Sequence, residues 1–252
     1  MPSAYFHALV VLVVSAAMIL AGVGLSRHWR RTPRANSHSA ELSTYVTVIG
    51  TLYAVLVAFV LLSVWEQYDT AKNAAEREAS QISDLLRLAG GLPEPGATRI
   101  KEAVREYAIA VVDEEWGRMA VGGRSARVDK ALDQLWKLIV GTDPAGDRAV
   151  NVHSQALERL SSVSDSRQAR LSQARPSVQT VIWVLLIFGG VLTLLSTSFL
   201  ETSSNIHLPV NAGLTLMIAF MLYLIFAFDH PFSHDVGTGP GAMRVVLESI
   251  QR

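Results

Sequence analysis

The sequence predicts an all-α membrane protein, with four transmembrane helices and a soluble helical bundle inserted between spans two and three. Half of the 252 residues are hydrophobic, and the mean hydropathy is positive. Four apolar windows contain no Asp, Glu, Lys or Arg and are long enough to cross a bilayer, namely residues 4–25, 45–65, 177–200 and 208–228. Between the second and third windows, the polar residues 66–176 show helical periodicity.

Composition excludes several kinds of function. The formal net charge is zero, which indicates no nucleic-acid partner. The chain has no cysteine, which excludes disulfides, thiolate metal sites and thiol nucleophiles. It also has no glycine-rich phosphate loop, no nucleophile elbow and no metal-binding spacing on one helix. We therefore predict no enzyme, no cofactor and no metal, and we predict the lipid bilayer as a partner.

The chain divides into four parts. They are residues 1–65 with spans one and two, residues 66–176 with the bundle, residues 177–228 with spans three and four, and the tail 229–252. The loop 26–42 carries four arginines and one acid, Glu41, so the positive-inside rule assigns it to the cytoplasm. With four spans, the bundle is then predicted to lie outside the cytoplasm.

The second span continues into the bundle without a helix breaker. No Pro or Gly occurs between Gly50 and Gly90, so residues 43–90 are predicted to form one helix roughly 70 Å long. Small residues recur every fourth position at Gly50, Ala54 and Ala58. This stripe allows close approach of another helix, either a neighbour in the same chain or one across a symmetry axis where the stripe lines a pore.

Turn residues divide the rest of the bundle. The first helix ends in GGLPEPG (Gly90 to Gly96), because two Gly and two Pro cannot continue a helix. Thr98 is the predicted N-cap of the second helix, and Gly122-Gly123 ends it. Ser125 is the predicted N-cap of the third helix. A fourth helix is predicted from Asp147, and Pro176 suits the first turn of the next span.

Two further features of the chain are open to interpretation. Asp113, Glu114 and Glu115 are interpreted as a solvated face, with Trp116 as an anchor of the bundle core. In the third span, hydroxyls share one face at Thr193, Ser196 and Thr197. They either bond to backbone carbonyls and neighbouring helices or line a wet path.

Charged residues gather where three spans are predicted to meet the bundle. They are Glu66, Asp69, Arg175, Asp229 and His230. Glu66 or Asp229 is predicted to pair with Arg175 in a structural clasp. The alternative is a ring of carboxylates, repeated by oligomer symmetry, at a cation-attracting mouth. A metal site that adds His234 and Asp235 matches no calcium or zinc motif, so none is predicted.

Several short motifs follow one another along the chain. They are GTLYAVLVAFVLLSVWEQYDTA (Gly50 to Ala71), Glu78-Ala79, Glu115-Trp116, Arg167-x-x-Arg170-Leu171 and Asp229-x-Pro231-Phe232. In this order they resemble the bacterial bestrophin-like domain family of four-span proteins. The family name implies kinship with bestrophins, which are pentameric anion channels with a hydrophobic neck on the second span. The resemblance therefore implies a multi-pass protein of the bacterial inner membrane that self-associates, as a pentamer, and passes small ions. It also implies neck candidates at Val57, Leu61 and Val64.

Two functional hypotheses follow. The first is a homo-oligomeric ion channel whose pore runs along the second span. The alternative is a non-conducting membrane sensor or scaffold, because two spans that flank a helical soluble domain resemble the input half of bacterial receptors. The loops 26–42 and 201–207 are too short for a signalling domain, so such a sensor would need a partner.

Overall fold

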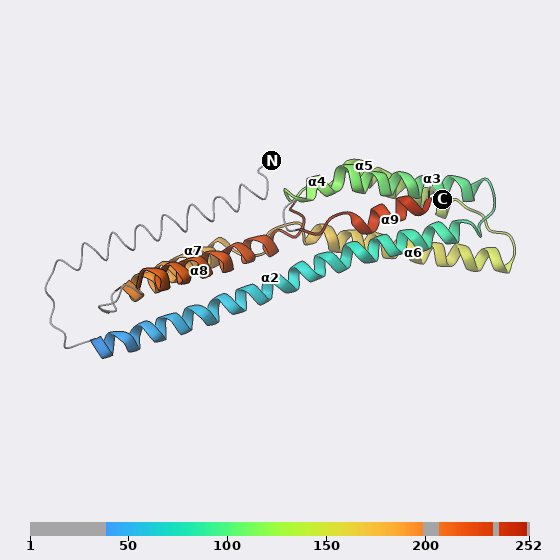
Figure 1. Cartoon of the computed structure of the whole chain (residues 1–252). Coiled ribbons are helices and arrows are strands. Elements are labelled where there is room, and N and C mark those ends of the chain that lie inside the picture. The colour runs from blue at the N-terminus through green and yellow to red at the C-terminus, as the bar shows by residue number, and fades with distance from the viewer. Residues whose placement is uncertain (1–38, 199–206, 234–236, 251–252) are drawn as a thin grey trace. The chain divides into compact units, whose positions relative to one another are not determined.

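A computed structural model describes residues 39–198, 207–233 and 237–250 (Figure 1). Within them every regular element is helical, which confirms the all-α prediction for this part of the chain. The elements are α2 (Ser39–Ala89), α3 (Gly96–Ala110), the π-helical turn η1 (Val111–Glu115), α4 (Trp116–Met119), α5 (Ala126–Val140), α6 (Asp147–Ser172), α7 (Thr180–Ser198), α8 (His207–Asp229) and α9 (Gly241–Ile250).

Three described helices are long and apolar enough to cross a membrane. These segments are Ser43–Ala89, Thr180–Thr197 and Pro209–Asp229. The first predicted span, residues 4–25, lies outside the described residues, so the count of four stays a prediction. α2 is one helix of 51 residues, about 75 Å long at 1.5 Å per residue. The predicted unbroken passage from the second span into the bundle is therefore confirmed.

The chain forms two compact units that divide after Glu66 on α2. The membrane unit contains the first part of α2 together with Ser177–Asp229, and the bundle unit contains Gln67–Pro176 together with the tail from His230 onward. The tail contributes a helix, α9, to the bundle core.

In the membrane unit, apolar residues of α2, α7 and α8 share one core. Its buried members are Tyr53, Val57, Val64, Leu186, Ile218 and Ile225. Close approach of α7 to α2 requires glycine, because a Cβ on Gly189 would lie 2.6 Å from Cδ2 of Tyr53. Gly190 is similarly tight, since a Cβ there would lie 3.0 Å from the Tyr53 hydroxyl oxygen.

We therefore expect Gly189→Ala to destabilise the membrane unit by about 1–3 kcal/mol, because the new methyl group overpacks the contact with the Tyr53 ring. Thermal unfolding of the purified protein in detergent measures the effect. Gly213→Ala on α8 is the matched control, since a Cβ there meets nothing within 4 Å. An equal response of the two variants would contradict the tight contact.

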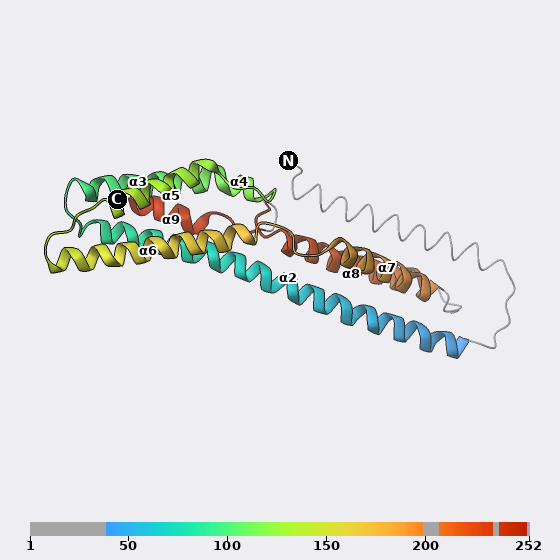
Figure 2. The same ribbon diagram turned by 180° about the vertical axis from the view of Figure 1, so that it is seen from behind.

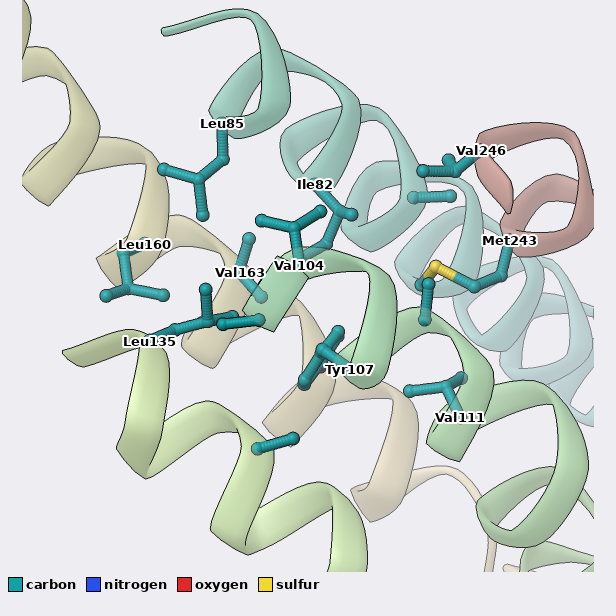
Figure 3. Packing of buried hydrophobic residues seen from close by; sticks show 14 of the residues in the cluster. Ile82, Leu85, Val104, Tyr107, Val111, Leu135, Leu160, Val163, Met243 and Val246 are labelled. Carbon is teal, nitrogen blue, oxygen red and sulfur yellow. The ribbon is translucent and has the colours of Figure 1, made fainter. Parts of the chain in front are cut away.

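The bundle core lies among the second half of α2 and α3, α5, α6 and α9, as Figures 1 and 2 show from opposite sides. In Figure 3 its side chains converge from all five helices. The labelled residues are Ile82 and Leu85 of α2, Val104 and Tyr107 of α3, Val111 of η1, Leu135 of α5, Leu160 and Val163 of α6, and Met243 and Val246 of α9.

The helix caps partly follow the sequence prediction. The Ser125 side chain accepts hydrogen bonds from the backbone N–H groups of Arg127 and Val128, so it caps α5 as predicted. The predicted cap at Thr98 is wrong, because α3 begins earlier, at Gly96. Thr98 instead donates from its backbone N–H and its hydroxyl to the carboxylate of Glu94. Glu94 therefore satisfies one of the backbone N–H groups in the first turn of α3.

Candidate functional site

The predicted pore residues of α2 fall on different faces of that helix. Val57 and Val64 are buried in the core of the membrane unit, and Leu61 is half-buried against it. Ala54 and Ala58 are exposed, and a Cβ on Gly50 would meet nothing within 4 Å. The small-residue stripe thus lies beside the face that α2 buries in its own chain. Its role at a pore stays a prediction.

Large apolar side chains also cover the exposed part of α2. Leu52, Val55, Phe59 and Leu62 expose between 48% and 69% of their surface. In a bilayer such a face contacts lipid tails or another helix.

The hydroxyl groups of the third span bond to backbone carbonyls, which was the first of the two interpretations from the sequence. Thr193, Ser196 and Thr197 each donate a hydrogen bond to a backbone carbonyl oxygen within α7, over 2.7–2.9 Å. Thr193 and Ser196 are also buried. These bonds use the O–H donors within the helix.

The charged residues near the ends of the spans have local partners. Oδ1 of Asp229 accepts the backbone N–H groups of Ser177, at 2.8 Å, and Val178, at 3.0 Å, just before α7. This carboxylate therefore ties the end of α8 to the start of α7 within the membrane unit. Asp69 accepts from the side-chain amide of Asn73 at 2.8 Å on α2.

The clasp and mouth predictions for the charged residues at the span ends stay predictions. Glu66 is exposed and His230 is half-buried. In the bundle unit, the carbonyl oxygen of Arg175 accepts from Nε2 of Gln67 at 3.3 Å. His234 and Asp235 lie outside the described residues.

The bundle contains a buried charge network that the sequence analysis did not assemble. It joins Glu78 of α2, Glu115 of η1 and the pair Arg167 and Arg170 of α6, and these side chains are between 0% and 8% exposed. Arg170 donates from Nε to Glu78 at 2.6 Å and from Nη2 to Glu115 at 2.7 Å. Arg167 pairs with Glu115 and, at 2.9 Å, with the partly exposed Asp129 of α5.

Neutral groups complete the hydrogen bonding of the two carboxylates. The hydroxyl of Tyr107 donates to Oε1 of Glu78 over 2.8 Å. The backbone N–H of Ser125 donates to Oε1 of Glu115 over 3.3 Å. The Trp116 ring lies 5.4 Å from Cζ of Arg170, a cation–π distance. Both buried carboxylates are therefore bonded from more than one side, as burial of a charge requires.

The electrostatics of the network favour its charged form. Burial raises the pKa of the Glu115 carboxyl, but hydrogen bonds and positive charge from Arg167 and Arg170 outweigh burial and leave the pKa lowered. Burial lowers the pKa of Arg170, and the carboxylates of Glu78 and Glu115 raise it to a net value above the usual one. Burial and the charge of Glu78 raise the pKa of Tyr107, so the phenol keeps the proton that it donates.

The interpretation of Glu115 as part of a solvated face is wrong, whereas Asp113 is exposed and Glu114 is half-buried. The reason lies in η1, where the backbone N–H of Trp116 bonds to the carbonyl of Val111 five residues earlier. This turn directs both Glu115 and Trp116 into the bundle. The prediction that Trp116 anchors the bundle core is confirmed, since it is 8% exposed and belongs to that core.

A signal for the network was present in the sequence. Arg167 lies four residues after Val163, and Arg170 lies three residues after Arg167, so both continue the apolar face of Leu160 and Val163. Glu78 likewise occupies a core position four residues before Ile82. Charged residues of both signs at core positions of separate helices predict a buried ion pair, but spacing alone does not select the partners.

The tail after α8 reaches the same network. Phe232, which is 2% exposed, lies edge-on to Trp116 with ring centroids 5.5 Å apart. The indole N–H of Trp116 donates to the carbonyl of Thr238 at 2.9 Å, and Thr238 N–H donates to Pro231 at 2.7 Å. Trp116 therefore contacts both Arg170 and the chain that follows the last span.

The buried charge network links helices of the bundle to one another. The four buried charges bond to one another and to bundle residues, which fixes the register of α2, η1 and α6. Among the described residues, no group of three or more His, Asp or Glu side chains is placed to hold a metal ion. The chemistry that these residues can supply is a set of strong, directional links between helices.

Comparison with known proteins identifies the family. A family model described as the bestrophin-like domain matches residues 13–243, which includes the buried network, Trp116 and Phe232. No curated protein and no solved structure matches the chain. Because the match covers most of the 252 residues and agrees with the motifs that the fold brings together, the chain belongs to the bestrophin-like domain family.

Proposed function

We propose that this membrane protein is the subunit of a homo-oligomeric ion channel, a pentamer by family resemblance, with its pore along the second span. The observation that carries the proposal is α2 itself. The helix runs unbroken from an uncharged membrane segment to Glu78 in the buried network. Its stripe at Gly50, Ala54 and Ala58 is open to the approach of a second helix.

The neck is placed at Leu61 in this proposal. Val57 and Val64 are already buried against α7 and α8, so turning them toward a pore would expose apolar surface of the membrane core. Leu61 lies at the border between that core and the small-residue stripe, and it is half-buried. Its isobutyl group is large enough to narrow a pore that the neighbouring alanines leave open.

The bundle would control the span through rigid links. Arg170 binds Glu78 on the helix that continues the proposed pore segment. Trp116 holds Phe232, which follows the last residue of α8 by three positions. A change in the network would thus act on two membrane helices at once.

The experiment is conductance of purified protein in planar bilayers. Leu61→Ala is expected to change the conductance, because it widens the proposed constriction. Leu52→Ala is the matched control, since Leu52 is 67% exposed and lies on the opposite face of the same helix, nine residues or two and a half turns before Leu61, so its change is expected to leave conductance as it is. A silent bilayer with well-folded wild-type protein would remove the channel proposal.

The second candidate is a non-conducting sensor or scaffold, which the densely bonded bundle also suits. Membrane crosslinking separates the two functions. A sensor requires contacts with another protein, whereas the channel requires contacts between copies of α2. The arginine-rich loop supports a bundle outside the cytoplasm for either function.

A further inference from the structure

A rigid turn after α4 presents an apolar side chain to solvent. Gly122 has a positive φ of 71°, and its N–H donates to the carbonyl of Met119 at 2.9 Å. The N–H of Gly123 donates to the carbonyl of Arg118, also at 2.9 Å. These two bonds form a Schellman motif, which closes the helix in one defined conformation. The turn leaves Val121 81% exposed, the most exposed of the large hydrophobic residues described.

Two arginines flank this valine. The side chains of Arg118 and Arg124 are 54% and 69% exposed. Each makes one contact with an acid of the bundle, Arg118 with Glu114 at 2.7 Å and Arg124 with Asp129 at 3.2 Å. A guanidinium carries five N–H donors, so an exposed arginine with one such partner still has donors for a phosphate oxygen.

Contacts within the bundle unit connect the turn to Gln67, the residue at which α2 enters that unit. A Cβ on Gly122 would lie 3.6 Å from Cγ of Arg175, and the Arg175 carbonyl accepts from Gln67. Gln67 follows Trp65, the last residue of the uncharged window, by two positions, or about 3 Å along α2. Figures 1 and 2 agree in showing α4 at the end of the bundle where α6 ends.

We infer that the turn Arg118–Arg124 docks on the bilayer, with Val121 in the headgroup layer and Arg118 and Arg124 bound to the phosphates of anionic phospholipids. An exposed valine between two exposed arginines matches the boundary between apolar tails and negative headgroups. We commit to lipid as the occupant because the turn is connected through Arg175 to Gln67, which follows the uncharged window of α2 by two positions. The inference does not depend on ion conduction.

The absence of cysteine makes the depth of this turn measurable. Val121→Cys in the full-length chain, labelled with a nitroxide, is placed in nanodiscs that contain phosphatidylglycerol. The matched control is Val140→Cys, which is 63% exposed at the opposite end of α5 from Ser125. We expect a several-fold higher ratio of oxygen to nickel-chelate accessibility at position 121 than at position 140.

A second arm tests the charge. Arg118→Gln with Arg124→Gln is expected to reduce the ratio at position 121 in phosphatidylglycerol nanodiscs, whereas Arg87→Gln, at a distant exposed position, should leave it unchanged. Pure phosphatidylcholine should reduce the ratio for the wild type, and free inorganic phosphate should not change it. Circular dichroism confirms that the variants remain folded.

Either of two results would overturn the inference. One is equal nickel accessibility at positions 121 and 140, which would place the turn in water. The other is an immobilised label at position 121 that both reagents fail to reach, because this would mean that a protein, rather than lipid, covers Val121.

Discussion

Replacing Arg170 with methionine is expected to destabilise the bundle by about 3–5 kcal/mol, because it leaves the buried carboxylate of Glu78 without its cation and leaves Glu115 with Arg167 alone. Glu78 and Glu115 are both 0% exposed, so neither can recover its charge stabilisation from water. Glu78 would lose two charge-assisted hydrogen bonds and keep the one from Tyr107. Denaturant unfolding of the purified protein, followed by circular dichroism, measures the change.

Two controls separate lost pairing from a general effect of arginine. Arg87→Met removes a guanidinium that is 79% exposed on the same helix as Glu78, and it should cost no more than about 1 kcal/mol. Adding Glu78→Gln to Arg170→Met removes the orphaned charge, so it should restore part of the stability. If Arg170→Met behaves like Arg87→Met, the network does not hold the bundle together.

Replacing Trp116 with alanine is expected to release the tail from the bundle, at a cost of about 3–5 kcal/mol. The indole fills a buried site, donates to the Thr238 carbonyl and lies edge-on to Phe232. Its loss removes the cation–π contact with Arg170 in the same step. Amide hydrogen exchange should therefore become much faster in α9, and faster to a smaller extent in α6.

The tail prediction also has graded controls. Trp116→Phe keeps an aromatic ring but loses the N–H donor, so it should give a smaller effect than alanine. Val245→Ala changes a side chain of α9 that is 64% exposed, and exchange in α9 should then stay slow. Continued slow exchange in α9 of the Trp116→Ala protein would show that the tail is held by other contacts, such as those of Met243 and Val246.

Together these two changes test one idea about the molecule. It is that Arg170 and Trp116 connect α2 and the chain that follows α8 within the bundle. Glu78 belongs to the helix that contains the second span, and Phe232 follows the last residue of α8 by three positions. A buried ion pair is a weak source of net stability but a strong constraint on register, because misaligned charges stay unpaired. A channel or a sensor would use such a constraint to pass motion between a soluble bundle and a membrane.

The sequence by itself determined the long helix α2 and the capped start of α5. An uncharged window as long as Tyr45 to Trp65 has few alternatives to a spanning helix, and the absence of Pro and Gly before Gly90 leaves that helix nothing to end it. Ser125 was recognisable as a cap because its signal is local. The motifs that carry the family resemblance include Glu78, Glu115 and Arg170, but their spacing along the chain does not show that these side chains contact one another.

Only the tertiary structure decided which charged residues matter together. Glu78, Glu115 and Arg170 are separated by as many as 92 positions along the chain, and no local pattern states which carboxylate meets which guanidinium. The π-helical turn rotates Glu115 inward from an acidic run that would otherwise suit solvent, and helical periodicity does not foresee one extra residue in a turn. Packing also decided that Val57 and Val64 are buried while Ala54 and Ala58 are exposed. The sequence could not decide this, because the membrane segment of α2 is apolar on all sides and has no polar face that would orient it.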